Sequence, residues 1–400
     1  MLRLIAVSLL PSLLGVAGCG DEDAGTAAPS SDTGSGVTDG GPAPPPDAPP
    51  TPTPPTPTPP ATPCTDAPYA VPGPYVSGVT TVTIDGATVE LWYPADPGAE
   101  SGQSPEVYDL RNWLPADSRP LVPEDAPTTF SSAAFRDIAP SEAGPFPLVL
   151  FSHGLGGYRL QSSFLTAHLA TWGFVVAAPE HEGRNMTAIL SGGLPRDDAF
   201  AQMTATYEWL SAEATRAGGT FEGVVDTVRL AVMGHSAGGG AVQALVDESE
   251  LPIAGWVGMA SIAAPEDDSL PALLMAGTED DIAAETNVRR GFDGLTTPDK
   301  RYVAIAGAGH LAFSDICLIG RERGGVLRIA QDSGIDVPDL VARLAQDGCR
   351  PTDLPAERAW PLIDHFVTAH LRMTFGQSSD GLTDSAASCF GALVQSYLHP

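Results

Sequence analysis

Downstream of residue 63, short apolar runs alternate with longer segments whose apolar positions recur at helical spacing. Alternating strand and helix patterns are typical of βαβ units, which build a mostly parallel sheet. The predicted strands span residues 78–84, 88–93, 147–152, 173–178, 229–234, 253–259, 272–276 and 302–306. The predicted helices span residues 160–171, 197–214, 237–247, 284–292 and 356–375.

The first two predicted strands are joined by Asp85-Gly86, a pair that favours a tight hairpin turn. A hairpin followed by repeated strand–helix units fits the α/β-hydrolase fold, a mostly parallel central sheet flanked by helices. Residues 95–146 are loop-like and rich in Pro and Ser, and we expect them to cover a sheet edge or shape the site. Residues 311–355 contain two cysteines and a helix-like run at 337–344, and we expect an insertion there.

The N-terminal segment has a different composition. Residues 1–18 carry one early Arg and an apolar run too short and too Pro-interrupted for a membrane span, which predicts a secretory signal peptide. The run leads into VAGC, which resembles the lipobox of bacterial lipoproteins and makes Cys19 the expected lipidation site. Gly20 after it favours, by the same resemblance, anchoring to the outer membrane, facing the periplasm or the cell surface. An ordinary signal peptide with a nearby cysteine is the alternative.

Residues 19–63 are predicted to be a disordered tether. Their first half is mainly Gly, Ser, Thr, Ala and Asp, and more than half of residues 41–63 are Pro. This composition disfavours a packed core and favours an extended polyproline II spacer. A Pro-rich ligand for a partner domain is the alternative. We therefore expect one folded domain at residues 64–400, with the α/β-hydrolase fold, held away from a membrane by the spacer.

The net charge of −29, from 20 basic and 49 acidic residues, narrows the set of partners. The chain contains no basic run, so nucleic-acid binding is disfavoured. The same excess of acidic residues opposes docking onto anionic lipid, which leaves the lipid anchor as the expected membrane contact. We expect a monomer.

Four cysteines remain besides Cys19: Cys64, Cys317, Cys349 and Cys389. An even number in an exported chain predicts two disulfides, for which three pairings are possible. We favour Cys317–Cys349, which closes a local segment, with Cys64–Cys389, which ties the two ends of the domain. Buried free thiols are the alternative.

Metal-ligand spacing is not found in the sequence. The closest cysteines are 32 positions apart, which excludes a Cys-x-x-Cys site. His365 and His370 are five positions apart on a predicted helix and point in different directions. We therefore predict no metal and no cofactor.

The segment RLAVMGHSAGGG places Ser236 between a predicted buried strand and a helix. A strand-to-helix turn of this kind strains the serine backbone and exposes its Oγ at the edge of the sheet. Gly234 and Gly238 suit the turn because a Cβ at either position would crowd the reversing chain. The pattern predicts a nucleophile, although a Gly-rich turn without chemistry would share it.

A serine nucleophile needs a base and an orienting carboxylate, which follow it in the α/β-hydrolase order of Ser, acid, His. LLMAGTEDDIAA places acids directly after a predicted strand. Asp280 is the preferred triad acid, with Asp281 and Glu279 as competitors. VAIAGAGHLAFSD places His310 just after the next predicted strand, as the general base.

An oxyanion hole needs two backbone N–H donors, one after the nucleophile and one from the loop after the third strand of the fold. Ala237 follows Ser236 directly. PLVLFSHGLGGYR is an apolar strand that opens into a glycine-rich loop containing Leu155. We predict that the N–H groups of Ala237 and Leu155 form the hole.

The segment FSHGLGGYRLQSSFLTAHLATWGFVVAAPEHEGRN, together with GHSAGG and GHLAFSD, resembles plasma-type platelet-activating-factor acetylhydrolases and their bacterial relatives, the dienelactone-hydrolase-like and cutinase-like esterases. The resemblance covers about residues 69–316 and the last helix. It implies metal-independent serine ester hydrolysis with Ser236, Asp280 and His310 as the triad. Segment 311–355 and the tail after Phe375 depart from the pattern, which leaves the substrate pockets open. A dienelactone hydrolase itself would use a cysteine nucleophile.

The sequence therefore predicts a serine carboxylic-ester hydrolase that acts outside the cytoplasm on a small-molecule, lipid or polymer ester. Short-chain, phospholipid-like and polyester substrates are all compatible with the residues. A surface lipoprotein that uses the hydrolase cleft only for binding is one alternative. A serine peptidase or acyltransferase on the same fold is the other.

Overall fold

The computed structural model describes residues 64–400 apart from 193–194 and 267–268. The chain divides into one unit of residues 1–59 and a second of residues 60–400. The predicted signal peptide, the tether and Cys19 lie outside the described residues. Within those that are described, no helix has both the length and the apolar character needed to cross a membrane.

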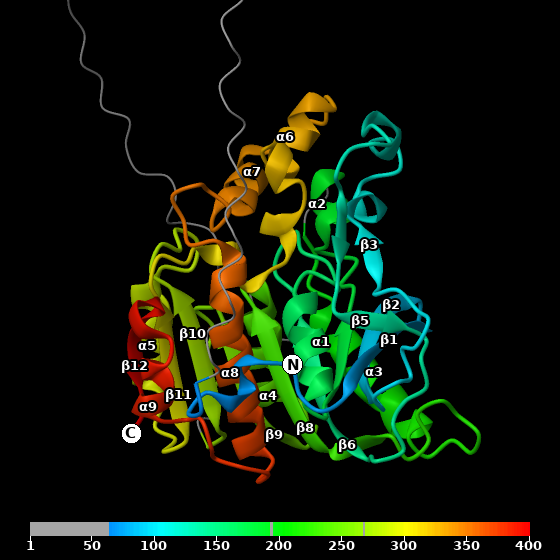
Figure 1. Cartoon of the computed structure of the whole chain (residues 1–400). Helices are drawn as coiled ribbons and strands as arrows, with labels where there is room; N and C mark the ends of the chain where they lie inside the picture. The colour runs from blue at the N-terminus through cyan, green and yellow to red at the C-terminus, as the bar shows by residue number, and fades with distance from the viewer. Residues whose placement is uncertain (1–63, 193–194, 267–268) are drawn as a thin grey trace, which may run out of the picture. The chain divides into compact units, whose positions relative to one another are not determined.

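The described part of the second unit is organised around a ten-stranded sheet (Figure 1). Its strand order is β12-β11-β10-β9-β8-β6-β7-β2-β1-β5. The strands from β7 to β11 pair in parallel, whereas β1, β2 and β12 join by antiparallel pairing and β5 lies parallel to β1. The bounds are β1 Val76–Ile84, β2 Ala87–Ala95, β5 Ala134–Arg136, β6 Phe146–Ser152, β7 Val175–Pro179, β8 Val225–His235, β9 Ile253–Met259, β10 Ala272–Gly277, β11 Lys300–Ile305 and β12 Val394–Leu398. A separate two-stranded sheet pairs β3 (Val107–Asp109) with β4 (Thr129–Ser131).

Helices cover both faces of the sheet, which is why its central strands are continuous apolar runs. α1 (Ser163–Thr171) and α8 (Ala356–Thr374) pack on one face, where the rings of Phe164 and Trp360 stack with centroids 4.5 Å apart. α3 (Ala199–Glu213), α4 (Ala237–Glu248) and α5 (Glu285–Gly294) pack on the other. The side chains of β6 alternate between the two apolar cores, and all seven residues of the strand are buried.

Shorter elements lie beyond the layers, several of them near the edge where the parallel strands end (Figure 1). The short α-helices are α2 (Met186–Leu190), α6 (Gly325–Asp332), α7 (Asp339–Gln346) and α9 (Asp384–Ser388). The 3₁₀ helices are η1 Pro68–Ala70, η2 Leu110–Trp113, η3 Arg119–Leu121, η4 His310–Phe313, η5 Ile316–Leu318, η6 Arg321–Arg323 and η7 Gly391–Leu393.

The strands and long helices expected from the sequence are all present, with ends shifted by a few residues. Residues 95–146, expected to be loop-like, also contain β3, β4, β5 and two 3₁₀ helices. The tail after α8 adds an edge strand, β12, that was not predicted. These strands are short. β5 and β12 pair with strands that are distant in sequence, and β3 pairs with β4 across a long loop. Local periodicity therefore gives little sign of them.

Two disulfides join the pairs favoured from the sequence. Cys64–Cys389 links the segment before η1 to the end of α9, across 325 positions of sequence. Cys317–Cys349 closes the segment that contains α6 and α7. The first disulfide therefore fastens both ends of the described unit, and the second fastens the segment that contains α6 and α7.

We expect the double substitution Cys64→Ser/Cys389→Ser to lower the free energy of unfolding by about 2–4 kcal/mol, because it releases a very long loop in the unfolded chain. The measurement is the thermal unfolding midpoint, with Ser388→Ala as a control at the neighbouring exposed position. An unchanged midpoint in the double variant would show that the disulfide does not constrain the domain.

Candidate active site

Ser236 occupies a sharp turn between β8 and α4, with φ 55° and ψ −120°. A non-glycine residue adopts such a conformation only when its surroundings impose it. The close packing of Gly234 and Gly238 imposes this conformation on Ser236. A Cβ on Gly234 would lie 2.3 Å from the Gly238 carbonyl oxygen, and a Cβ on Gly238 would lie 2.0 Å from the Ser152 carbonyl oxygen. The turn is thus packed against the end of β6.

Three side chains predicted to act together form a hydrogen-bonded chain. The Oγ of Ser236 lies 2.8 Å from Nε2 of His310, and Nδ1 of His310 lies 2.9 Å from Oδ2 of Asp280. His310 begins η4 after β11, and Asp280 follows β10, so neighbouring parallel strands bring them to the same edge of the sheet. The Nδ1–Asp280 contact fixes the tautomer that leaves Nε2 able to accept the Ser236 proton.

The environment of Asp280 stabilises its charged form. Burial by itself would raise the pKa of the carboxyl, but His310 and the backbone N–H groups of Ile282 and Ala283 lower it below its ordinary value. The competing acids are placed elsewhere. Asp281 pairs with Arg350 at 3.0 Å with its side chain 70 % exposed, and Glu279 is exposed.

The predicted oxyanion donors flank Ser236. Ala237 is the first residue of α4, where helix geometry leaves the N–H without an intrahelical acceptor. The loop after β6 lies directly against the serine, since a Cβ on Gly154 would be 3.1 Å from the Ser236 Cβ. Leu155 follows in that loop and lines the same cavity as Ser236.

Arg184 contacts both segments that meet at the Ser236 turn. Its Nη2 donates to the Oγ of Ser152 at 2.7 Å and to the carbonyl oxygen of His153 at 3.0 Å. Its Nη1 donates to the carbonyl oxygen of Ala237 at 3.1 Å. The guanidinium therefore links the end of β6 to the start of α4, on which the two predicted oxyanion donors depend.

Two buried residues of the same region were not singled out as functional by the sequence. His235 contacts Gln161 through Nδ1 and the carbonyl oxygen of His310 through Nε2, each at 3.0 Å. Burial, with the nearby His310, lowers the pKa of His235 to about 3, so this ring is neutral at pH 7. The neutral ring of His235 holds the backbone of His310 in place through this hydrogen bond.

Asp347 is the other buried residue, and it follows α7 directly. Its Oδ1 accepts the backbone N–H of His310 at 2.8 Å, and its Oδ2 accepts that of Asp281 at 2.9 Å. Burial raises the pKa of this carboxyl despite both hydrogen bonds. The sequence around it, AQDGC, carries no catalytic pattern, and only its position before a disulfide cysteine marked the segment as unusual.

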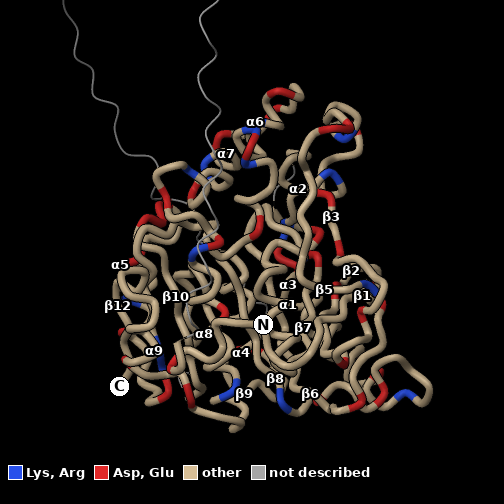
Figure 2. The backbone as a smooth tube through the Cα atoms, viewed as in Figure 1, with Lys and Arg blue, Asp and Glu red and all other residues tan. Residues whose placement is uncertain are grey.

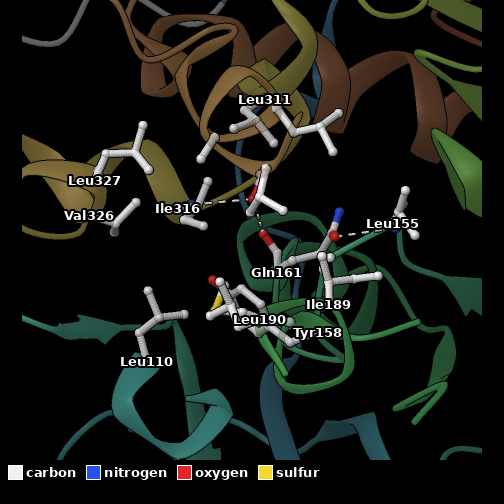
Figure 3. Close-up of a pocket in the computed structure, with 18 of the residues that line it drawn as sticks. Leu110, Leu155, Tyr158, Gln161, Ile189, Leu190, Leu311, Ile316, Val326 and Leu327 are labelled. Atoms are coloured by element: carbon white, nitrogen blue, oxygen red, sulfur yellow. Dashed lines mark hydrogen bonds between the residues drawn. The ribbon is translucent and has the colours of Figure 1, made fainter. Parts of the chain in front are cut away.

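Ser236 and His310 line an apolar cavity that opens to solvent. Figure 3 shows other residues that line this cavity. Its walls come from α2, η2, α6, α7 and the loop after β6. No charged side chain of the described residues lines it, although acidic residues are scattered over other parts of the unit (Figure 2). The described residues also contain no group of three or more His, Cys, Asp or Glu side chains that could hold a metal ion.

The packing of the turn gives a test with a matched control. Gly238→Ala forces a Cβ into the Ser152 carbonyl, so we expect a cost of about 1–3 kcal/mol or more and a fall of several degrees in the unfolding midpoint. Gly240 lies two residues further along α4, and a Cβ at this position would have no atom within 4 Å. Gly240→Ala should be neutral or stabilising, because alanine favours a helix more than glycine does. Equal midpoints in the two variants would contradict the proposed packing constraint.

The chain is similar to several known esterases. A family described as PET hydrolase-like matches residues 142–318. Cutinase est2 of Thermobifida alba is 29% identical over 225 residues, which are 53% of this chain and 69% of the relative. A platelet-activating factor acetylhydrolase of Gallus gallus is 34% identical over 93 residues, which are 22% of this chain and 20% of the relative.

Among solved structures, a ferulic acid esterase from Streptomyces cinnamoneus superimposes with a TM-score of 0.54 at 23% identity, covering 76% of this chain and 92% of that chain. This likeness and the strand order confirm the fold expected from the sequence. With the sequence similarities, they identify the chain as an α/β-hydrolase of the carboxylic-ester-hydrolase class.

Proposed function

We propose that the chain hydrolyses carboxylic esters through an acyl-enzyme, with Ser236 as nucleophile, His310 as general base and Asp280 as the orienting acid. The observation that carries this proposal is the pair of contacts at 2.8 and 2.9 Å that links the three side chains. A serine alcohol becomes a useful nucleophile only when such a base stands ready to accept its proton.

In the first half-reaction, Nε2 of His310 takes the Ser236 proton as Oγ attacks the ester carbonyl carbon. The N–H groups of Leu155 and Ala237 donate to the oxygen that becomes negative, and Asp280 stabilises the imidazolium. His310 then returns the proton to the departing alcohol oxygen as the C–O bond breaks. In the second half-reaction, His310 takes a proton from water as the water oxygen attacks the acyl carbon. His310 then returns this proton to Oγ of Ser236 as the acyl C–Oγ bond breaks, which releases the acid and free Ser236.

The substrate class follows from the cavity and the relatives together. The matched proteins are described as a cutinase, a PET hydrolase-like family, a platelet-activating factor acetylhydrolase and a ferulic acid esterase. The cavity lining offers apolar surface and no charged partner for a substrate group. A small-molecule, lipid or polymer ester without a charge next to its scissile bond fits this lining.

We also propose that the enzyme works outside the cytoplasm as a monomer, with residues 64–400 as its catalytic domain. Two disulfides support export, because such bonds persist in oxidising compartments. The VAGC sequence supports lipidation of Cys19 and an outer-membrane anchor, and the Pro-rich residues 41–63 support a spacer. These N-terminal residues lie outside the described part of the chain.

We expect Ser236→Ala to lower kcat for p-nitrophenyl acetate by at least about 10⁴-fold and to abolish labelling by a fluorophosphonate. Asp280→Asn should lower kcat by roughly 10³–10⁴-fold, because the wrong tautomer of His310 is favoured.

The matched control is Asp281→Asn, which changes the adjacent exposed acid and should leave kcat within about twofold. Equal turnover by wild type and Ser236→Ala would refute the mechanism. A wild-type protein that neither turns over the ester nor reacts with the fluorophosphonate would instead be a binding protein on this fold.

A further inference from the structure

Helices α6 and α7 turn their apolar sides toward the cavity above Ser236. Val326, Leu327 and Ala330 of α6 line it, and so do Val341, Leu344 and Ala345 of α7. Residues spaced three or four apart share one face of a helix, so each helix presents an apolar stripe to the cavity. The exposed side chains of the two helices include Arg328, Asp332, Asp339 and Arg343.

The position of α6 is fixed by a small core of its own. Ile329 is buried against Val122 and Ile335, away from the main sheet. This contact ties α6 to the segment that precedes β4. The helix is therefore held over the cavity by packing, and the neighbouring Val326 and Leu327 project into the open space seen in Figure 3.

The opposite wall is apolar as well. Met186, Ile189 and Leu190 of α2 face the cavity and are half-buried. The side chains of both walls are partly accessible to water. Binding of an apolar ligand is therefore favourable, because it removes this apolar surface from water. The polar side chains of the lining are Ser236, His235, His310, Gln161, Ser314 and Tyr158.

We propose that α6 and α7 make this cavity a binding site for the long, uncharged acyl chain of a monomeric ester, and that they determine chain-length selectivity. This inference rests on the proposed function of Ser236. The absence of charged lining among the described residues gives a phosphate or ammonium headgroup no partner inside, and the net charge of −29 disfavours anionic substrates. Both helices lie outside residues 142–318, the part that the PET hydrolase-like family matches.

The test measures kcat/KM for p-nitrophenyl acetate, butyrate and octanoate, each below its solubility limit. Burial of one methylene contributes about 0.8 kcal/mol, or roughly fourfold, as an upper guide. We expect kcat/KM to rise at least tenfold from acetate to octanoate. A phospholipid vesicle and a polyester film should release little more product with wild type than with Ser236→Ala.

A pair of adjacent substitutions on α7 supplies the matched control. Val341→Asp puts a charge on the cavity face and should reduce the octanoate-to-acetate ratio to near one. Leu340→Asp changes the neighbouring residue, which is 50% exposed and outside the cavity lining, and should leave the ratio unchanged. Leu327→Asp on α6 repeats the test if α7 does not tolerate the first change.

The possible results distinguish a failure of this inference from a failure of the proposed function. A wild-type ratio near one, equal ratios in the Val341 and Leu340 variants, or film hydrolysis that matches octanoate turnover would overturn the role of α6 and α7 while leaving ester hydrolysis intact. Loss of all hydrolysis and of fluorophosphonate labelling in wild type would overturn the proposed function itself.

A second observation concerns the backbone that carries the triad. The carboxylate of Asp347 is fully buried and bridges two loops, one after β11 through His310 and one after β10 through Asp281. Its own carbonyl oxygen accepts the N–H of Leu311 at 2.8 Å. Hydrogen bonds from N–H groups to a carboxylate are stronger than those to a neutral acceptor.

We infer that Asp347 is a positioning residue for the His310–Asp280 pair. The two loops come from different strands, and a misplacement of about 1 Å can cost roughly 10²-fold in rate. The segment that carries Asp347 is itself fastened, because Cys349 is disulfide-bonded to Cys317 beyond η4. The hydrogen bonds of Asp347 and the Cys317–Cys349 disulfide therefore both fasten the chain around residues 347–349 to the segment that follows β11.

We expect Asp347→Asn to lower kcat for p-nitrophenyl acetate by 10- to 100-fold with KM within about twofold, because the cavity is unchanged. Fluorophosphonate labelling of Ser236 should slow by a similar factor. Asp347→Ser, which can still accept one N–H, repeats the test if the first variant folds poorly.

Asp353→Asn is the control, since Asp353 also accepts two backbone N–H groups in this segment, from Gly348 at 2.9 Å and Arg350 at 3.2 Å, but bridges no triad loop. It should lower the unfolding midpoint while changing kcat by less than about threefold. Equal losses of kcat at Asp347 and Asp353, or a kcat within twofold of wild type in Asp347→Asn, would overturn the positioning role.

Discussion

The close contact between the Ser236 turn and the end of β6 is the constraint on which the site depends. Gly238 lies against the Ser152 carbonyl only because β6 and β8 are parallel neighbours with Ser152 opposite Gly234. The same register carries the loop after β6 alongside the serine, and this loop contains Leu155, the proposed second oxyanion donor. The strained serine and the donor loop are thus two results of one strand pairing.

Burial gives the polar residues around this contact different roles. Burial lowers the pKa of His153 to about 4 and that of His235 to about 3, so both rings are neutral at pH 7 and act as hydrogen-bonding supports. A charged ring at either position would repel the positive charge that His310 carries in the proposed mechanism. Asp280, by contrast, is kept ionised by His310 and two backbone N–H groups, and it can stabilise that charge.

Residues 311–355 contact both the cavity and the loops after β10 and β11. Helices α6 and α7 form one apolar wall of the cavity, and Asp347 accepts backbone N–H groups from His310 and Asp281 in those loops. The Cys317–Cys349 disulfide encloses these features in one closed segment.

The sequence by itself determined the strand–helix order, the disulfide partners that were favoured and the candidate residues Ser236, Asp280 and His310. It could do so because parallel strands bring their carboxyl ends to one edge, where motifs distant in the chain must meet. Only the tertiary structure separated Asp280 from the adjacent Asp281 and revealed Asp347, which lies 37 positions from His310. These choices depend on which way neighbouring side chains face and which loops meet, and local periodicity carries no information about either.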